Sequence, residues 1–174
     1  KFIQSVPIIS KKKSLINTYD FKVYNKFLDK NLLTLGFYAS ASNSLIGKNV
    51  KLSERRFLPS NKLRGFESGK IGPMDGTDYI GGNYAMSFNI AATIPQILPN
   101  SENTDFSLFI DAANIWGIDY DSSINDGSTI RSSAGIAVNW YTPIGPLNFS
   151  LSEVLNKHSN DKTESFRFNL GTTF

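Results

Sequence analysis

The clearest pattern in the chain is the segment Asn83-Tyr84-Ala85-Met86-Ser87-Phe88-Asn89-Ile90-Ala91-Ala92-Thr93-Ile94. Its even-numbered positions are apolar or aromatic, whereas its odd-numbered positions carry only small or polar side chains. Because the side chains of a β-strand point alternately to opposite faces, the segment predicts a strand with one apolar and one polar face. Such strands occur in membrane β-barrels, between lipid and a polar lumen, and also in soluble sheets.

The same alternation recurs on both sides of this segment, and helical spacing fits none of the repeats better. We expect further strands over residues 15–27, 33–41, 105–116 and 130–141. A shorter apolar run consists of Leu147, Phe149 and Leu151, and a weaker first strand over Phe2 to Ile8 contains Pro7. With the closing strand described next, the sequence predicts an all-β, antiparallel fold of about eight strands.

The last nine residues are Phe166-Arg167-Phe168-Asn169-Leu170-Gly171-Thr172-Thr173-Phe174. One face of the expected strand carries Phe166, Phe168, Leu170 and Phe174, and the other carries Arg167, Asn169 and Thr173. A glycine inside a strand weakens its pairing, so Gly171 marks a position where this strand can bend or detach.

The connections between the expected strands alternate in length. Short turns are expected at 28–31 and 143–146, and long loops at 43–82, 117–128 and 156–162. The connection 95–103 is of medium length and would lie at the same end of the sheet as the short turns. Bacterial outer-membrane barrels have short periplasmic turns and longer extracellular loops. The alternation therefore favours a transmembrane barrel over a soluble one and places the C-terminus on the periplasmic side.

Several function classes lack the residues that they need. The chain has no cysteine and one histidine, His158, so neither a catalytic triad nor a cysteine or histidine metal site is expected. The basic run Lys11-Lys12-Lys13 has no interleaved aromatic residues, which indicates a solvated turn and no nucleic-acid surface. In the acidic segment 119–127, Ile124 stands where a calcium loop requires glycine. We expect no enzyme, cofactor or metal.

A connection of about forty residues lies between the expected strands 33–41 and 83–94. Loops of this length are usually functional or disordered, and this one is not of low sequence complexity. It contains Leu63-Arg64-Gly65-Phe66, then Ile71-Gly72-Pro73, then Gly81-Gly82-Asn83. A glycine between an arginine and an aromatic residue suggests a tight backbone site that presents both side chains. The tetrapeptide alone is also compatible with a surface turn.

Taken together, these motifs resemble the BamA-type outer-membrane assembly factors of the bacterial surface antigen superfamily. In that family a loop with an Arg-Gly-Phe or Arg-Gly-Tyr motif folds back into the barrel lumen. The segments 130–137, 143–147 and 166–171 resemble the last three strands of the family in the right order. The resemblance implies a sixteen-stranded barrel with POTRA domains ahead of it, so that residues 1–174 form its C-terminal half, without the POTRA domains and the first barrel strands.

The resemblance also implies a contact for the loop arginine. In the family this arginine pairs with an acidic residue on the inner wall, and the strand that supplies it resembles residues 109–116 here. The alternation independently places Asp111 on the polar face, so we expect Arg64 to pair with Asp111. The family often has a second acidic residue on the preceding strand. The position here that matches it is Ala91, so we expect the arginine to have one carboxylate partner instead of two.

The function implied by the resemblance is the assembly and insertion of β-barrel proteins into the bacterial outer membrane. The implied partners are unfolded outer-membrane protein precursors, the lipid bilayer and accessory lipoproteins, and the terminal Phe174 resembles the C-terminal recognition signal of outer-membrane barrels. Opening would occur at a lateral seam that includes the last strand. A two-partner-secretion transporter, which shares the loop motif, and a simple porin are the alternatives. Unpaired edges would let residues 1–174 alone self-associate, close into a small barrel or stay a half-barrel.

Overall fold

The structure, a computed structural model, describes residues 1–5, 14–28, 31–45, 47, 49–95, 103–124, 129–143 and 145–171. Several sequence predictions fall outside this range. They are the basic run at 11–13, the end of the first strand with Pro7, the inner residues of the short turn at 28–31, most of the 95–103 connection, residues 125–127 of the acidic loop, and Phe174.

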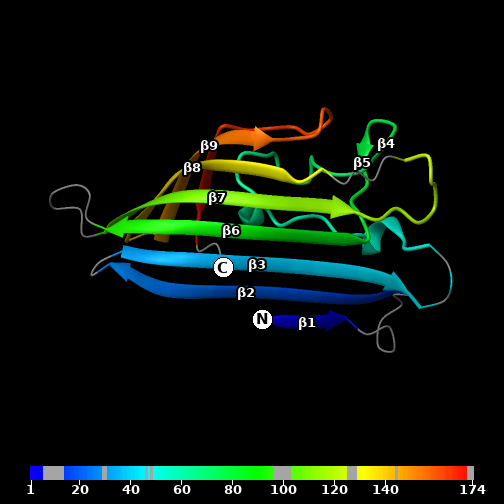
Figure 1. The fold of residues 1–174 in the computed structure, drawn as a ribbon, viewed down its shortest axis with the longest axis horizontal. Coiled ribbons are helices and arrows are strands. Elements are labelled where there is room, and N and C mark those ends of the chain that lie inside the picture. The colour runs from blue at the N-terminus through cyan, green and yellow to red at the C-terminus, as the bar shows by residue number, and fades with distance from the viewer. Residues whose placement is uncertain are drawn as a thin grey trace.

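Eight strands form one antiparallel sheet in the order β1-β2-β3-β6-β7-β8-β9-β10, which follows the order of the chain. Their bounds are β1 Phe2–Ser5, β2 Ser14–Leu28, β3 Asn31–Ser44, β6 Tyr84–Pro95, β7 Thr104–Trp116, β8 Arg131–Thr142, β9 Gly145–Asn156 and β10 Phe166–Leu170. The sheet curves into a trough and does not close, so β1 and β10 are its two edges (Figure 1). This confirms the all-β, antiparallel prediction, and the sheet of the described residues is not closed into a small barrel.

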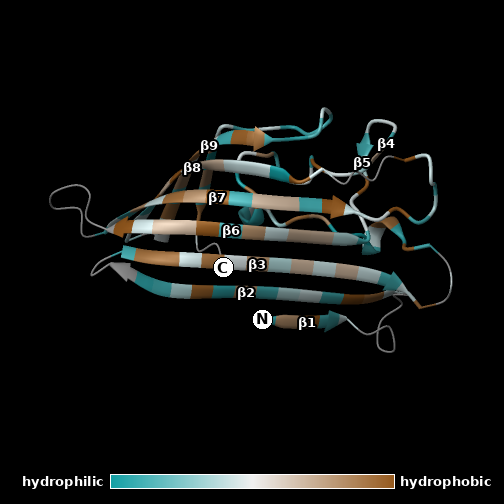
Figure 2. Cartoon of the chain, viewed as in Figure 1, coloured by the Kyte–Doolittle hydropathy of each residue, from teal (hydrophilic) through white to brown (hydrophobic). Residues whose placement is uncertain are grey.

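The two faces of the trough differ as the alternation predicts. On the convex face, Phe88, Leu108 and Ile136 are exposed, as are Phe166 and Phe168 at the edge. The concave face, called the lumen face below, carries buried Ser87, Asp111 and Ser133. Brown and pale residues therefore alternate along the strands in Figure 2. An apolar outer face over a polar inner face is the arrangement of a barrel that stands in a bilayer.

Two strand boundaries differ from the prediction. The run around Leu147 to Leu151 belongs to the twelve-residue strand β9, in which Glu153 interrupts the apolar row before Leu155. The closing strand ends at Leu170, where Asn148 Nδ2 and the Pro146 carbonyl take over the hydrogen bonds of Gly171. Gly171 has φ +104°, a conformation that glycine adopts without the strain of a Cβ, so the strand bends there.

The long loop lies inside the trough. It includes two 3-10 turns, η1 Leu52–Glu54 and η2 Ser60–Lys62, and a small hairpin of β4 Met74–Asp75 and β5 Asp78–Tyr79. A buried cluster joins the loop to the lumen face: Leu58, Leu63, Phe66 and Ile71 from the loop with Tyr38, Ala85, Ala113 and Ile115 from the strands. Burying apolar side chains against the wall gives the loop a fixed position over one end of the trough. None of the described helices is long and apolar enough to cross a membrane.

Candidate functional site

Arg64, in the long loop, and Asp111, on β7, form a bidentate ion pair. Arg64 Nε donates to Asp111 Oδ2 at 2.7 Å, and Nη2 donates to Oδ1 at 2.8 Å. The backbone N–H of Arg64 donates to the same Oδ2 at 3.1 Å. The Asp111 side chain is fully buried, whereas the Arg64 side chain is 20% exposed. Parallel N–H···O bonds to a carboxylate fix orientation as well as distance, so this pair sets the position of the loop.

Asp111 has a second side-chain partner that the sequence did not predict. The residue paired with Asp111 on the preceding strand is Asn89, two positions from Ala91. Asn89 Nδ2 donates to Asp111 Oδ1 at 2.9 Å and to the Lys62 carbonyl of the loop at 2.9 Å. The expected pair is therefore a network of three side chains with one carboxylate, in which an amide occupies the neighbouring inward position.

The guanidinium of Arg64 also stacks on an aromatic ring. Its Cζ lies 3.4 Å from the ring centroid of Phe109, which is buried on the lumen face of β7. A desolvated guanidinium gains from the negative face of a ring, so the stacking holds the plane in which the arginine meets Asp111. The alternation had placed Phe109 on this face, but it gave no sign of the stacking.

Gly65 is needed where the loop touches the wall. Its φ is +86°, and a Cβ there would lie 3.2 Å from both the Ser133 Cβ and the Ser152 Cβ. On one side of it Ser133 Oγ donates to the Arg64 carbonyl at 2.5 Å, and on the other side Phe66 is 2% exposed. The conformation and the short contacts both disfavour a side chain, so the glycine lets Arg64 and Phe66 dock together.

A second arginine–aspartate pair was not predicted. Arg131, the first residue of β8, donates from Nε and Nη2 to Asp161 in the β9–β10 loop, at 2.9 and 3.1 Å. Asp161 also accepts from the backbone N–H of His158 at 2.7 Å and, more weakly, of Gly72 in the long loop at 3.4 Å. The side chains are 3% and 1% exposed. The only signal in the sequence was an arginine on the polar face at the start of a strand.

Further polar contacts join the long loop to its neighbours. Lys62 Nζ donates to Asp20 of β2 at 2.6 Å, and Asp119 in the β7–β8 loop accepts from the Val50 N–H at 2.8 Å. In the same region Tyr120 donates to Asp75, and this hydrogen bond raises the pKa of the Tyr120 phenol. Burial raises the pKa of Tyr79, which donates to the Asn160 carbonyl. Both phenols thus remain protonated donors at neutral pH.

The remaining predicted residues lie at the edge of the sheet. Phe166, Phe168 and Leu170 are exposed on the convex face of β10, as the prediction requires, and Arg167 points to the lumen face. Phe168 packs against Phe149 of β9 with ring centroids 5.1 Å apart. No described residue pairs with the free edge of β10.

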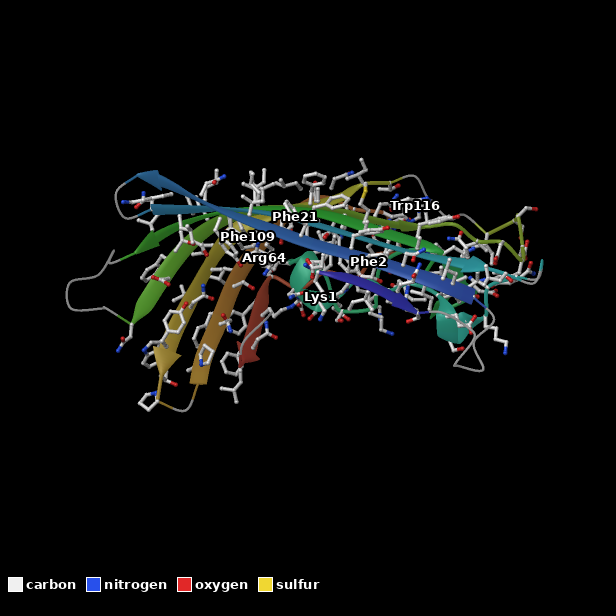
Figure 3. The ribbon with its side chains drawn as sticks, turned by 90° about the horizontal axis from the view of Figure 1, so that it is seen from below. Lys1, Phe2, Phe21, Arg64, Phe109 and Trp116 are labelled. Atoms are coloured by element: carbon white, nitrogen blue, oxygen red, sulfur yellow. The ribbon has the colours of Figure 1, made fainter. Side chains whose placement is uncertain are left out.

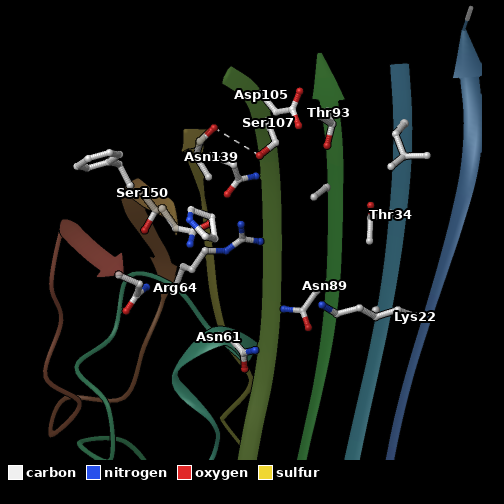
Figure 4. A pocket seen from close by; sticks show the side chains of 18 of the residues that line it. Lys22, Thr34, Asn61, Arg64, Asn89, Thr93, Asp105, Ser107, Asn139 and Ser150 are labelled. Atoms are coloured by element: carbon white, nitrogen blue, oxygen red, sulfur yellow. Dashed lines mark hydrogen bonds between the residues drawn. The ribbon is translucent and has the colours of Figure 1, made fainter. Parts of the chain in front are cut away.

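A polar cavity of about 500 Å³ lies beside the Arg64 network, on the part of the lumen that the loop leaves open (Figure 4). Its lining includes Arg64, Asn89, Asn139, Ser150 and Arg167. Figure 3 shows Arg64 close to Phe109, within the trough. Among the described residues there is no group of three His, Asp or Glu that could hold a metal. The chemistry available here is hydrogen bonding and charge pairing.

Comparison with known proteins identifies related sequences. The profile of the Omp85 superfamily domain matches residues 4–174. The outer membrane protein assembly factor BamA of Neisseria meningitidis serogroup B is 33% identical over 141 residues, which cover 64% of this chain and 17% of that protein. A SAM50-like protein of Schizosaccharomyces pombe is 35% identical over 132 residues, covering 68% and 27%.

A solved structure agrees with the fold. The crystal structure of BamA from Haemophilus ducreyi lacking POTRA domains 1–3 superposes with a TM-score of 0.82 and 28% sequence identity, covering 92% of this chain and 35% of that one. The chain thus spans between 17% and 27% of the length of the two curated relatives and about a third of the solved one.

Proposed function

Because the chain belongs to the Omp85 superfamily, we propose that it is the C-terminal half of a larger outer-membrane barrel that assembles and inserts other β-barrel proteins. The open sheet supports the first part, since β1 and β10 leave two unpaired edges that a further set of strands would close. The relatives support the second part, since the outer membrane protein assembly factor BamA of Neisseria meningitidis is one of those named above.

The observation that carries the proposal is the clamped loop. A forty-residue loop cannot fit inside an eight-stranded barrel, whose interior its own side chains fill. Here the loop lies in the trough and is held by Arg64, Asn89 and Asp111 beside an open polar cavity. This supports a wide intact barrel whose lumen holds the loop next to the strand edge.

The substrates would be unfolded barrel precursors, which offer unpaired strands. A strand edge binds such a chain by main-chain hydrogen bonds. The edge strand β10 is suited to this because it is short and the chain bends at Gly171, directly after it. The accessory lipoproteins and POTRA domains expected from the resemblance belong to this proposal. A secretion transporter is not favoured, because the curated relatives named above are an assembly factor and a SAM50-like protein.

Depletion of the intact protein in its own cells tests the proposal. We expect the amounts of many outer-membrane β-barrel proteins to fall together, and a wild-type copy to restore them. An Arg64→Ala copy should restore them poorly, although the protein still reaches the membrane and shows the heat-dependent gel mobility of a folded barrel. Loss of one secreted protein with normal barrel levels would instead indicate a transporter and refute the assembly function.

A further inference from the structure

The last strand has little pairing of its own. β10 is five residues long, whereas β7, in the middle of the sheet, is thirteen. It pairs with β9 from Phe166 to Leu170 and has no partner on its other side among the described residues. Something other than the sheet must contribute to holding it.

Arg167, on the lumen face of β10, connects this strand to the long loop. Its Nε donates to the Glu164 carboxylate, Nη1 to the Ser60 carbonyl and Nη2 to the Phe66 carbonyl. All three guanidinium nitrogens therefore have an acceptor, and two of the acceptors are loop backbone. The side chain is 10% exposed. A planar guanidinium can serve three acceptors in fixed directions, which a lysine ammonium on a flexible stem does less well.

The segment before β10 pairs with the loop as well. Phe66 and Thr163 form an isolated β-bridge, and the Glu164 N–H donates to the Gly65 carbonyl at 3.1 Å. The Glu67 N–H donates to the Lys162 carbonyl at 3.0 Å, and the Lys162 N–H donates to the Lys70 carbonyl at 3.0 Å. Residues 162–164 thus use the loop as their neighbouring strand before the chain enters β10 and pairs with β9.

The motif Arg64-Gly65-Phe66 is consequently held from two directions. On one side it is bound to Asp111 of β7 and Ser133 of β8, and on the other to Arg167 of β10. We propose that Arg167 is a positioning residue that couples the lumen loop to the last strand. Release of the loop then weakens the last strand, and detachment of the last strand loosens the loop. The role of this coupling in opening the seam rests on the proposed assembly function.

Thermodynamic reciprocity makes the coupling testable from both ends, since a change at one element must appear at the other. Amide hydrogen exchange in the intact protein in detergent micelles measures both elements at once. We expect Arg167→Gln to raise exchange about ten-fold or more in peptides covering 60–70 and 162–170, since a hydrogen bond to a charged group is lost. Arg167→Lys should give a smaller increase in both. Asp111→Asn, which acts from the β7 side, should raise exchange at 162–164.

Asn169→Ala is the matched control, because Asn169 is the next inward side chain of β10 and makes no hydrogen bond to the described residues of the long loop. It should leave exchange over 60–70 at the wild-type rate. The coupling is overturned if Arg167→Gln raises exchange in β10 alone, or if it changes neither region. Exchange is measured without any substrate. If both regions respond while the wild-type protein proves unable to assemble barrel proteins, the coupling stands and the proposed function fails.

Discussion

Two arginine–aspartate pairs with the same bidentate geometry attach loops to the lumen face, and their surroundings differ. Arg131 and Asp161 are enclosed, with side chains 3% and 1% exposed. Arg64 is 20% exposed and borders the polar cavity, while its partner Asp111 is fully buried. The first pair joins the wall to the β9–β10 loop, with a weak backbone contact to Gly72, and the second joins the wall to the loop motif itself.

This difference indicates separate tasks. A buried charge cannot be hydrated when its partner moves away. Breaking the Arg131–Asp161 pair therefore has a high cost in free energy. The Arg64 guanidinium can reach water in the cavity, so its pair with Asp111 can open at a lower cost. The β9–β10 loop, whose residues 162–164 pair with the long loop, thus has a fixed attachment to the wall, whereas the attachment of the Arg64 motif can be released.

Arg131→Ala should have the largest effect. It leaves the Asp161 carboxylate buried with only backbone donors, and removal of one partner of a buried pair typically costs about 3–5 kcal/mol. We expect the urea midpoint of the intact protein in micelles to fall accordingly. The double variant Arg131→Ala with Asp161→Ala should be less destabilised than Arg131→Ala alone, because no unpaired charge remains. An equal or larger loss in the double variant would contradict the enclosed-charge explanation.

Arg64→Ala should cost less, about 1.5–3 kcal/mol, the range of a hydrogen bond to a charged group. Asp111 keeps Asn89 and the backbone N–H of residue 64 as donors, which reduces the penalty of the unpaired carboxylate. Arg64→Ala should nevertheless lower assembly activity more than Arg131→Lys, a variant that keeps the positive charge at position 131. If Arg64→Ala is the more destabilising of the two alanine variants, the proposed order of the pairs is wrong.

Alternation in the sequence predicted most of the sheet, because a period of two directly reports which face a side chain occupies. It placed Asp111, Asn89 and Ala91 all on the lumen face. It could not choose between Asn89 and Ala91 as the neighbour of Asp111. These two positions share a face, and only the register of β6 against β7, which depends on the turn between them, separates them.

The second pair was beyond such reasoning for another reason. Arg131 lies at the start of a strand and Asp161 in an irregular loop, so no periodicity relates them. Their contact depends on how the β9–β10 loop folds over the rim and on the backbone of Gly72. The contacts of Arg167 could not be predicted for a similar reason. Two of its acceptors are backbone carbonyls of the loop, and since every residue carries a carbonyl, these acceptors leave no signal in the sequence.

Asn89→Ala should have the smallest effect on stability. It tests how far the Arg64–Asp111 pair depends on Asn89. Asn89 supplies one hydrogen bond to Asp111 and one to the Lys62 carbonyl, and its loss should cost about 1 kcal/mol, since the bidentate Arg64 contact remains. Asn139→Ala, another inward asparagine beside the cavity, is the matched control and should cost less. Measured with Arg64→Ala in a double-mutant cycle, Asn89→Ala should show a coupling energy, because both side chains bind one carboxylate. Strict additivity would mean that Asn89 holds the loop through Lys62 alone, and the inner site would then be a simple pair.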